Sequence, residues 1–313
     1  MTGGYVNPRA AIALYFAAIF LGGCLIAPWI HHLMQALASP LAFLKGLADE
    51  PFRRYVTRSW MIIGALTLWP FLKCLGANSL KGVGLRRGQR FGRELGIGFA
   101  IGFGSLAIIA ALALLYGARE FNFGHEPARY FKHMLNAVLA ALLVPIIEEV
   151  FFRGAIFGGM RKDQRLLSAA LGSSAIYAIV HFFQRSIWEG PVTWSSGLEL
   201  LPRMLSGFGD IQQLIPGFFS LTLAGMMLAL AYHRTGSLYL SMGLHGGWIF
   251  WLKSYGFLTL PIQGANARFW GTNKLIDGWL AFALLTFMFI GFWRWSQPPS
   301  STDNSSDESP NDN

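Results

Sequence analysis

Long apolar runs alternate with short polar segments along most of the chain. Eight of these runs are long enough to cross a membrane as helices, with expected limits at residues 10–33, 57–76, 94–116, 133–157, 166–188, 213–233, 237–256 and 277–295. An α-helix rises about 1.5 Å per residue and a hydrocarbon core is about 30 Å thick. The pattern therefore predicts an all-α polytopic membrane protein with about eight transmembrane helices.

Two polar stretches interrupt or follow these runs. The segment 188–210 is too long for a tight turn, and its apolar positions predict a short amphipathic segment along the interface; they are Leu198, Leu200, Leu201, Met204 and Leu205. Residues 297–313 are polar, acidic and rich in proline and serine, which predicts a disordered tail. We expect residues 1–132 to hold the first three helices, 133–256 the catalytic core, and 257–296 the last helix.

Composition and charge agree with a membrane protein. The chain has 313 residues, of which 53% are hydrophobic and 13% are charged, and its net charge is +9. In a soluble protein this positive charge would suggest binding to nucleic acid. Here Lys and Arg lie mostly in loops and indicate which side of the membrane each loop faces, so no nucleic-acid partner is expected. Two dense loops carry much of it, through Lys81, Arg86, Arg87, Arg90 and Arg93 and through Arg161, Lys162 and Arg165. The two loops lie on one side, which predicts that both termini face the cytoplasm.

Three charged residues lie inside the apolar stretch from Ala137 to Gly158, namely Glu148, Glu149 and Arg153. A charged side chain at the centre of a membrane helix costs about 2.5 to 3.5 kcal/mol on insertion scales, so this position requires a reason. Glu149 and Arg153 are four residues apart and project to the same helix face, where they can form a pair. Glu148 points about 100° away and needs a partner from another helix.

A buried ion pair that holds the helix in place is an equal alternative for Glu149 and Arg153, whereas an intramembrane carboxylate such as Glu148 favours a functional site. Pro145, one turn earlier, leaves the carbonyl of Ala141 without its helical donor, which is tolerable where protein or water meets the gap. This position favours a cavity beside Glu148.

Two histidines are candidates for the missing partner of Glu148. His181 and His245 interrupt two other predicted helices, and all three side chains fall in the middle third of the bilayer when depth is counted from the proposed cytoplasmic ends. Gly243, Gly246 and Gly247 surround His245. They would allow the close approach of a backbone or a substrate, and ordinary packing of small residues between helices explains them equally well.

Three sequence motifs now stand in order on separate helices: Glu148-Glu149 with Arg153 as EExxxR, Tyr177 with His181 as F/YxxxH, and His245. The pattern resembles the CAAX-protease and bacteriocin-processing family of intramembrane proteases, which includes type II CAAX prenyl endopeptidases and abortive-infection-like proteins. The resemblance covers about residues 133–256. It implies an all-helical membrane protein with a water-accessible cavity that cleaves peptide bonds of lipidated or membrane-embedded proteins.

The resemblance also implies roles for five residues. Glu148 and His181 would activate a water molecule, Glu149 and Arg153 would brace the site, and His245 would help to stabilise the oxyanion. The family's third motif usually has an asparagine four positions after the histidine, where this chain has Ile249. Ile249 cannot donate a hydrogen bond, so either another donor, such as the indole of Trp248, replaces it or the protein is slow or inactive.

Several alternatives stay open at this point. A divalent metal such as zinc, held by Glu148, His181 and His245 with an open position for water, is one form of the enzyme, and a metal-free glutamate and histidine pair is the other. The chain has no HExxH motif. A non-enzymatic membrane partner or immunity protein and a proton-coupled carrier are the competing functions. We expect an integral protein of a bacterial inner membrane whose partners are lipid and a peptide or lipidated substrate.

Overall fold

The computed structural model describes residues 7–76, 79–86, 88, 90–183, 186–209 and 214–297. Arg87 and the predicted tail beyond Gln297 lie outside this part of the chain. The predicted all-α class is confirmed, and a long helix lies within or across each predicted range. These helices are α1 (Pro8–Ala38), α3 (Phe52–Cys74), α4 (Phe91–Leu115), α5 (Pro127–Glu149), α7 (Leu166–His181), α10 (Ser220–Thr235), α11 (Tyr239–Leu258) and α13 (Trp279–Ser296).

Shorter elements complete the described chain. They are the short helices η1 (Ala42–Leu44), α2 (Lys45–Ala48), α6 (Gly158–Met160), α8 (Ser196–Met204), η3 (Ser206–Gly209) and α12 (Ala267–Trp270), the π-helices η2 (Val150–Phe157) and η4 (Leu214–Phe219), and the strands β1 (Arg119–Phe121) and β2 (Thr259–Pro261). The strands form a two-stranded antiparallel sheet in which Glu120 pairs with Leu260. Hydropathy did not predict this sheet, because strands of three residues leave no periodic signal.

The expected number of eight membrane spans is not confirmed. Within the described residues, five helices are long and apolar enough to cross a membrane: Pro8–Ala38, Phe91–Leu115, Pro127–Met160, Leu214–Thr235 and Trp279–Ser296. α7 is apolar but shorter. α3 begins with the charged segment FRRYVTR, and α11 contains glycine, serine and histidine and is buried over much of its length. These two helices are therefore less apolar than a helix that faces lipid on most sides.

α7 ends at His181 and not at residue 188 as predicted. Phe182, Phe183, Ile187 and Trp188 are apolar, and for this reason hydropathy extended the helix to residue 188. The chain instead leaves the helix at Phe182. His181 is therefore the last residue of α7.

Close packing of glycines joins α4 to α11. A Cβ atom built on Gly102 would lie 2.1 Å from the carbonyl oxygen of Leu244, and one on Gly243 would lie 2.1 Å from the carbonyl oxygen of Leu95. Similarly, a Cβ on Gly247 would lie 2.3 Å from the backbone nitrogen of Phe103. Helix packing, and not space for a substrate, is thus the explanation for the glycines beside His245.

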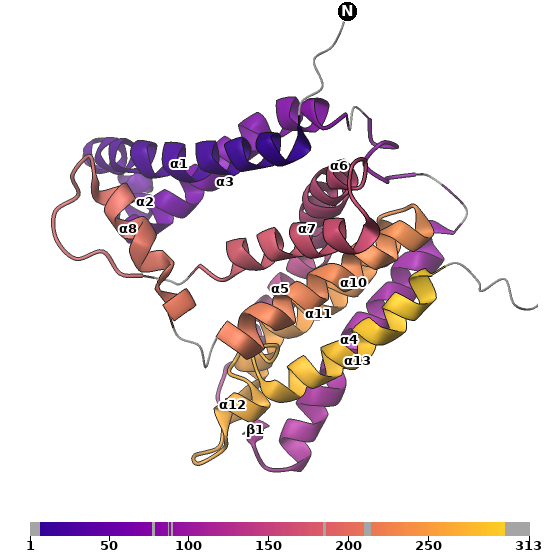
Figure 1. Ribbon diagram of the computed structural model, residues 1–313. Coiled ribbons are helices and arrows are strands. Elements are labelled where there is room, and N and C mark those ends of the chain that lie inside the picture. The colour runs from indigo at the N-terminus through magenta and orange to yellow at the C-terminus, as the bar shows by residue number, and fades with distance from the viewer. Residues whose placement is uncertain are drawn as a thin grey trace, which may run out of the picture.

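α1 and α3 lie side by side across the top of the view, transverse to α4, α10, α11 and α13, which run diagonally toward β1 (Figure 1). The indole nitrogen of Trp60 donates to the carbonyl of Phe20, and the hydroxyl of Tyr15 donates to the carbonyl of Gly64. α8 packs on this pair through Leu200 and Met204. The predicted amphipathic segment is therefore a helix, but its buried face contacts protein.

The basic loops and both ends of the described chain gather at one end of the molecule. Lys162 donates to the carbonyl of Leu75, which joins the loop after α6 to the end of α3. The carbonyl of Gly84 accepts from the backbone nitrogen of Leu238, at the turn between α10 and α11. The predicted placement of the two loops on one side is confirmed, whereas the cytoplasmic assignment stays a prediction.

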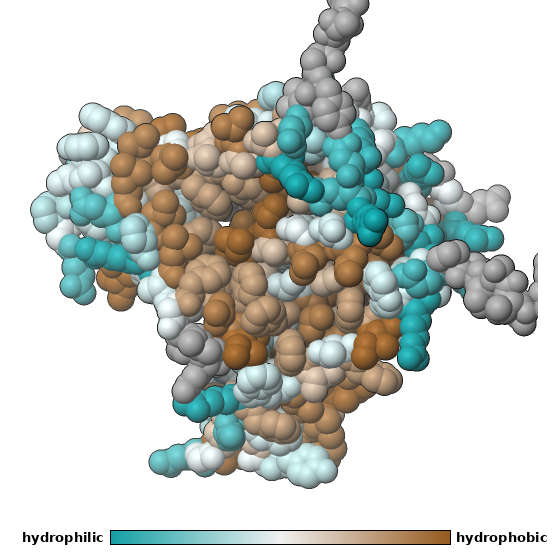
Figure 2. Space-filling model, in the orientation of Figure 1, coloured by the Kyte–Doolittle hydropathy of each residue, from teal (hydrophilic) through white to brown (hydrophobic). Residues whose placement is uncertain are grey.

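The outer surface exposes many large apolar side chains, more than a soluble protein usually does. Leu66, Phe131, Ile147 and Phe287 are exposed, each by at least two thirds. Figure 2 shows apolar residues over the middle of one face and hydrophilic residues at its upper right, near α6. Together with the long apolar helices, this surface identifies an integral membrane protein.

Candidate active site

The structure confirms the predicted pair in the charged helix. Arg153 Nη1 lies 3.0 Å from Glu149 Oε1, at the junction where α5 continues into the π-helix η2. The side chain of Glu149 is fully buried and that of Arg153 is 2% exposed. Arg153 Nη2 also donates to the carbonyl oxygen of Gly225 in α10, at 3.2 Å. This guanidinium therefore neutralises a buried carboxylate and connects two helices.

His245 extends the same ion pair from a third helix. Its Nδ1 lies 2.8 Å from Glu149 Oε1, and the residue is 1% exposed. Sequence analysis assigned Glu149 to the pair with Arg153 alone. The contact with His245 crosses between α5 and α11, so no spacing within one helix could have indicated it.

Glu148 has the two partners that were expected from other helices. Its Oε2 lies 3.3 Å from Nε2 of His181 and 3.7 Å from Nε2 of His245. This oxygen is buried and accepts no hydrogen bond from the described residues. The side chains of Glu148 and His181 are nevertheless 22% and 31% exposed, which gives this side of the site access to the exterior.

Tyr177 connects the two histidines. Its backbone carbonyl accepts from His181 Nδ1 at 2.8 Å, and its hydroxyl lies 3.4 Å from Nε2 of His245. The guanidinium carbon of Arg153 lies 4.7 Å from the centre of its ring, within the range of a cation–π contact. Sequence analysis used this tyrosine only as part of a motif and gave it no role.

The partners of the two Nδ1 atoms determine the tautomers of the neutral histidines. A carbonyl oxygen only accepts hydrogen bonds, so Nδ1 of His181 donates to Tyr177. Glu149, held as a carboxylate by Arg153, likewise accepts from Nδ1 of His245. Each neutral imidazole therefore presents an Nε2 lone pair to the space around Glu148.

The backbone near Pro145 is closed by protein. A Cβ built on Gly246 would lie 2.7 Å from the carbonyl oxygen of Ala141, which lacks its helical donor because residue 145 is proline. α11 thus covers this carbonyl, and the gap itself does not form the expected cavity. Glu148 is reached instead from the molecular surface, where part of its side chain is exposed.

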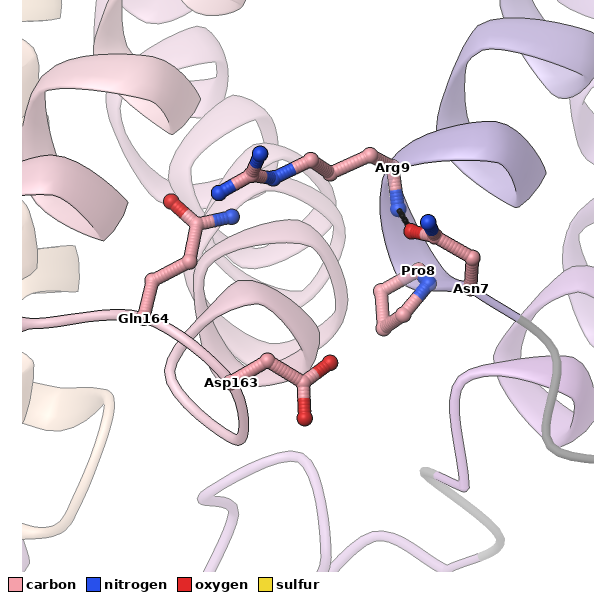
Figure 3. A pocket seen from close by; sticks show the side chains of 5 residues that line it. All are labelled: Asn7, Pro8, Arg9, Asp163 and Gln164. Carbon is pink, nitrogen blue, oxygen red and sulfur yellow. Dashed lines mark hydrogen bonds between the residues drawn. The ribbon is translucent and has the colours of Figure 1, made fainter.

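A separate cavity of about 250 Å³ lies at the end of the molecule where α1 begins and the loop after α6 passes. Figure 3 shows the five residues that line it, Asn7, Pro8, Arg9, Asp163 and Gln164. Asn7 accepts from the backbone nitrogen of Arg9 and so caps α1. None of the five predicted site residues contributes to this cavity.

Glu148, His181 and His245 are residues of the type that binds metal ions, but their positions do not form a metal site. Nε2 lone pairs supported through Nδ1 by a carbonyl and a carboxylate are typical of ligating histidines. Among the described residues, however, no group of three or more His, Cys, Asp or Glu side chains is arranged so that it could hold a metal ion.

Trp248 and Ile249, three and four positions after His245, do not supply a donor. The indole nitrogen of Trp248 donates to the hydroxyl oxygen of Ser105 in α4 at 3.0 Å, in the core between α4 and α11. Trp248 is therefore not the replacement that sequence analysis suggested for Ile249. Ile249 itself is half-buried.

Comparison with protein families agrees with the motifs. Residues 130–251 match the family model described as "Type II CAAX prenyl endopeptidase Rce1-like". The matched segment overlaps the predicted range and contains all five predicted site residues, so the resemblance is confirmed for this part of the chain. Comparison with curated proteins gives no match, and comparison with solved structures gives none either.

Proposed function

We propose that this chain, whose residues 130–251 match the type II CAAX prenyl endopeptidases, is an intramembrane endopeptidase that cleaves lipidated or membrane-associated proteins. The observation that supports it most is the position of Glu148. Its Oε2 is a buried acceptor with no hydrogen bond from the described part of the chain, and two imidazole nitrogens from other helices lie within 3.7 Å of it.

In the first step Glu148 acts as the general base. A water molecule beside Glu148 donates one hydrogen to Oε2 and is oriented by a second hydrogen bond to the Nε2 lone pair of His181. Its oxygen attacks the carbonyl carbon of the scissile peptide bond while its proton passes to Glu148. The products of this step are a tetrahedral oxyanion and a neutral Glu148.

In the second step the oxyanion collapses and the carbon–nitrogen bond breaks. The proton on Glu148 passes to the leaving amine, so Glu148 returns to its starting charge. The second hydrogen of the water stays with the new carboxyl group. The resemblance assigns His245 to the oxyanion side of the site, and its Nε2 lies 3.7 Å from Glu148. Because its hydrogen is on Nδ1, where Glu149 accepts it, the neutral ring has no N–H to offer the oxyanion.

Glu149 and Arg153 support this chemistry without taking part in proton transfer. Both are almost fully buried, and Arg153 also holds the carbonyl of Gly225. Their ion pair fixes the ring of His245 and the end of α5 from which Glu148 projects. Precise placement of this kind is what efficient proton transfer requires.

A substrate anchored in the bilayer suits the surroundings of the site. α5 exposes Leu142, Leu143, Ile146 and Ile147 immediately before Glu148. These side chains form an apolar surface that lipid or a lipid-attached peptide can contact. The structure therefore supports a substrate that reaches Glu148 from the membrane and not from bulk water.

The test compares new protein termini in native membranes that contain wild-type protein, Glu148→Gln or Leu66→Ala. Leu66 is 75% exposed on α3, a helix that carries none of the five site residues, so Leu66→Ala is the control. We expect a set of termini that persists in the control and disappears in Glu148→Gln. Equal abundance of all termini in the three membranes would contradict the proposal and favour a non-enzymatic protein.

Metal dependence requires a separate measurement. Glu148, His181 and His245 carry the atoms that a divalent metal would need, although their placement among the described residues forms no metal site. Elemental analysis of purified wild-type protein and of His245→Ala tests this directly. We expect less than about 0.1 metal ion per chain in both proteins and activity that is unchanged after chelation. A metal site would instead show about one ion per wild-type chain.

A further inference from the structure

The hydroxyl of Tyr177 is a buried O–H group within the site, and the proposed steps leave it without a role. Tyr177 is 5% exposed, and its hydroxyl lies 3.4 Å from Nε2 of His245. Its ring is held on several sides, by Arg153, by the edge contact with Phe152 and by the ring of His181. The hydroxyl therefore has a fixed position beside the histidine assigned to the oxyanion.

A tetrahedral oxyanion is stabilised by N–H or O–H groups that point at it, and the described residues offer few of them. The neutral histidines carry their hydrogens on Nδ1, where Tyr177 and Glu149 accept them. Arg153 donates to Glu149 and to Gly225. Within this set of residues, the tyrosine hydroxyl is the neutral donor whose hydrogen is directed toward the Nε2 side of His245.

Neither Trp248 nor Ile249 takes this role. The N–H of Trp248 is engaged with Ser105, in the core between α4 and α11. Ile249, one helical turn after His245, has no polar atom. The donor must therefore come from another helix, and α7 supplies Tyr177.

We propose that the hydroxyl of Tyr177 donates a hydrogen bond to the oxyanion formed during peptide cleavage. This inference rests on the endopeptidase function proposed above. In the free protein the hydroxyl hydrogen points at Nε2 of His245 across 3.4 Å, a long and weak hydrogen bond that is easily exchanged. When the oxyanion forms, the hydroxyl turns to it, and its hydrogen stays on the tyrosine oxygen throughout.

Tyr177→Phe removes the hydroxyl and keeps the ring that packs on Arg153 and Phe152. With a farnesylated CAAX peptide as substrate, we expect kcat to fall about 100-fold or more and KM to change by less than about twofold, as for loss of one oxyanion donor. Thermal stability in detergent should stay close to that of the wild type.

Tyr255→Phe is the matched control. Tyr255 is fully buried in the core that also contains Trp248, and its hydroxyl has no hydrogen-bond partner among the described residues. Its ring contact with Arg119 does not need the hydroxyl. We expect its kcat and KM to match those of the wild type. A comparable fall of kcat in both variants would overturn the assignment, because it would not be specific to Tyr177.

A donor introduced at Ile249 gives a second test, and its arm in the wild-type background does not depend on how well Tyr177→Phe folds. An asparagine there lies one turn from His245 on the same helix face. Ile249→Asn should raise kcat less than about threefold in the wild type but at least about tenfold in Tyr177→Phe, since only the latter lacks a donor. A tenfold or greater rise in the wild type would overturn the inference.

The inference and the proposed function fail in different ways. Wild-type kcat in Tyr177→Phe together with loss of cleavage in Glu148→Gln would overturn the role of Tyr177 and leave the endopeptidase intact. Equal cleavage of the peptide by the wild type and Glu148→Gln would reject the proposed function, and the role of Tyr177 with it.

Discussion

Two adjacent glutamates at the end of α5 have opposite surroundings. Glu149 is fully buried between Arg153 and His245, whereas Glu148 is 22% exposed and its Oε2 accepts no hydrogen bond from the residues that the structure describes. A rotation of about 100° between successive residues of a helix separates the two carboxylates. One therefore serves as a structural ion and the other is available to a water molecule.

This division predicts unequal effects on stability. Arg153→Ala leaves Glu149 buried without its guanidinium, which should lower the free energy of unfolding by about 3 to 5 kcal/mol. Glu148→Gln keeps the shape of the side chain and leaves the ion pair of Glu149 with Arg153 intact, so it should lower the free energy of unfolding clearly less than Arg153→Ala does. Thermal unfolding in detergent measures both, and equal losses would contradict the assignment of brace and base.

At the scale of elements, the contact between α4 and α11 depends on backbone approaching backbone. Gly102 and Gly104 lie two residues apart in α4 but differ in what surrounds them. A Cβ on Gly102 would lie 2.1 Å from the carbonyl oxygen of Leu244, whereas one on Gly104 would have no neighbour within 4 Å.

Gly102→Ala should therefore destabilise the protein by about 1 to 3 kcal/mol, because α4 must move away from α11. Gly104→Ala should be neutral or stabilise the protein by up to about 1 kcal/mol, since alanine favours the helix over glycine. Unfolding of the two variants in the same detergent compares them directly. Similar stabilities would show that α4 and α11 tolerate a wider separation.

Hydropathy predicted where most helices lie, because membrane helices need long apolar runs. It did not predict that α7 ends at His181, since Phe182 and Phe183 continue the apolar pattern after the helix stops. The π-helix from Val150 to Phe157 was also not predicted, because its extended hydrogen bonding has no signature in residue type. The ion pair of Glu149 with Arg153 still forms across the start of this π-helix.

At the scale of the whole molecule, the arrangement of loops predicts an orientation. Lys162 lies at the end that carries the basic loops, and Glu120 lies in the sheet at the opposite end (Figure 1). Basic loops favour the cytoplasm. Cysteines at these two positions, in a chain without Cys24 and Cys74, report the orientation through an impermeant maleimide.

In intact cells we expect labelling of Glu120→Cys and no labelling of Lys162→Cys. Opening the membrane should expose Lys162→Cys to the same reagent and so serves as the control for its reactivity. Labelling of position 162 from outside, with protection of position 120, would reverse the predicted orientation.

The assembly of the site was largely predictable, whereas its finer bonding was not. Similar depths in the membrane indicated that Glu148, His181 and His245 could meet, and the contacts of 3.3 Å and 3.7 Å bear this out. The partner of Trp248 depends on how α4 packs against α11, and the hydroxyl of Tyr177 depends on the orientation of α7. Such relations between helices are not encoded in the spacing within any one of them.

The early end of α7 has a consequence for the lipid around it. Leu166–His181 comprises 16 residues, and such a helix rises about 24 Å, which is about 6 Å less than an average hydrocarbon core. Where α7 faces lipid, a helix of this length requires a thinner bilayer beside it, at a cost of a fraction of a kcal/mol per Å. Cleavage would then vary with bilayer thickness, because His181 and its partner Glu148 lie at the end of this helix.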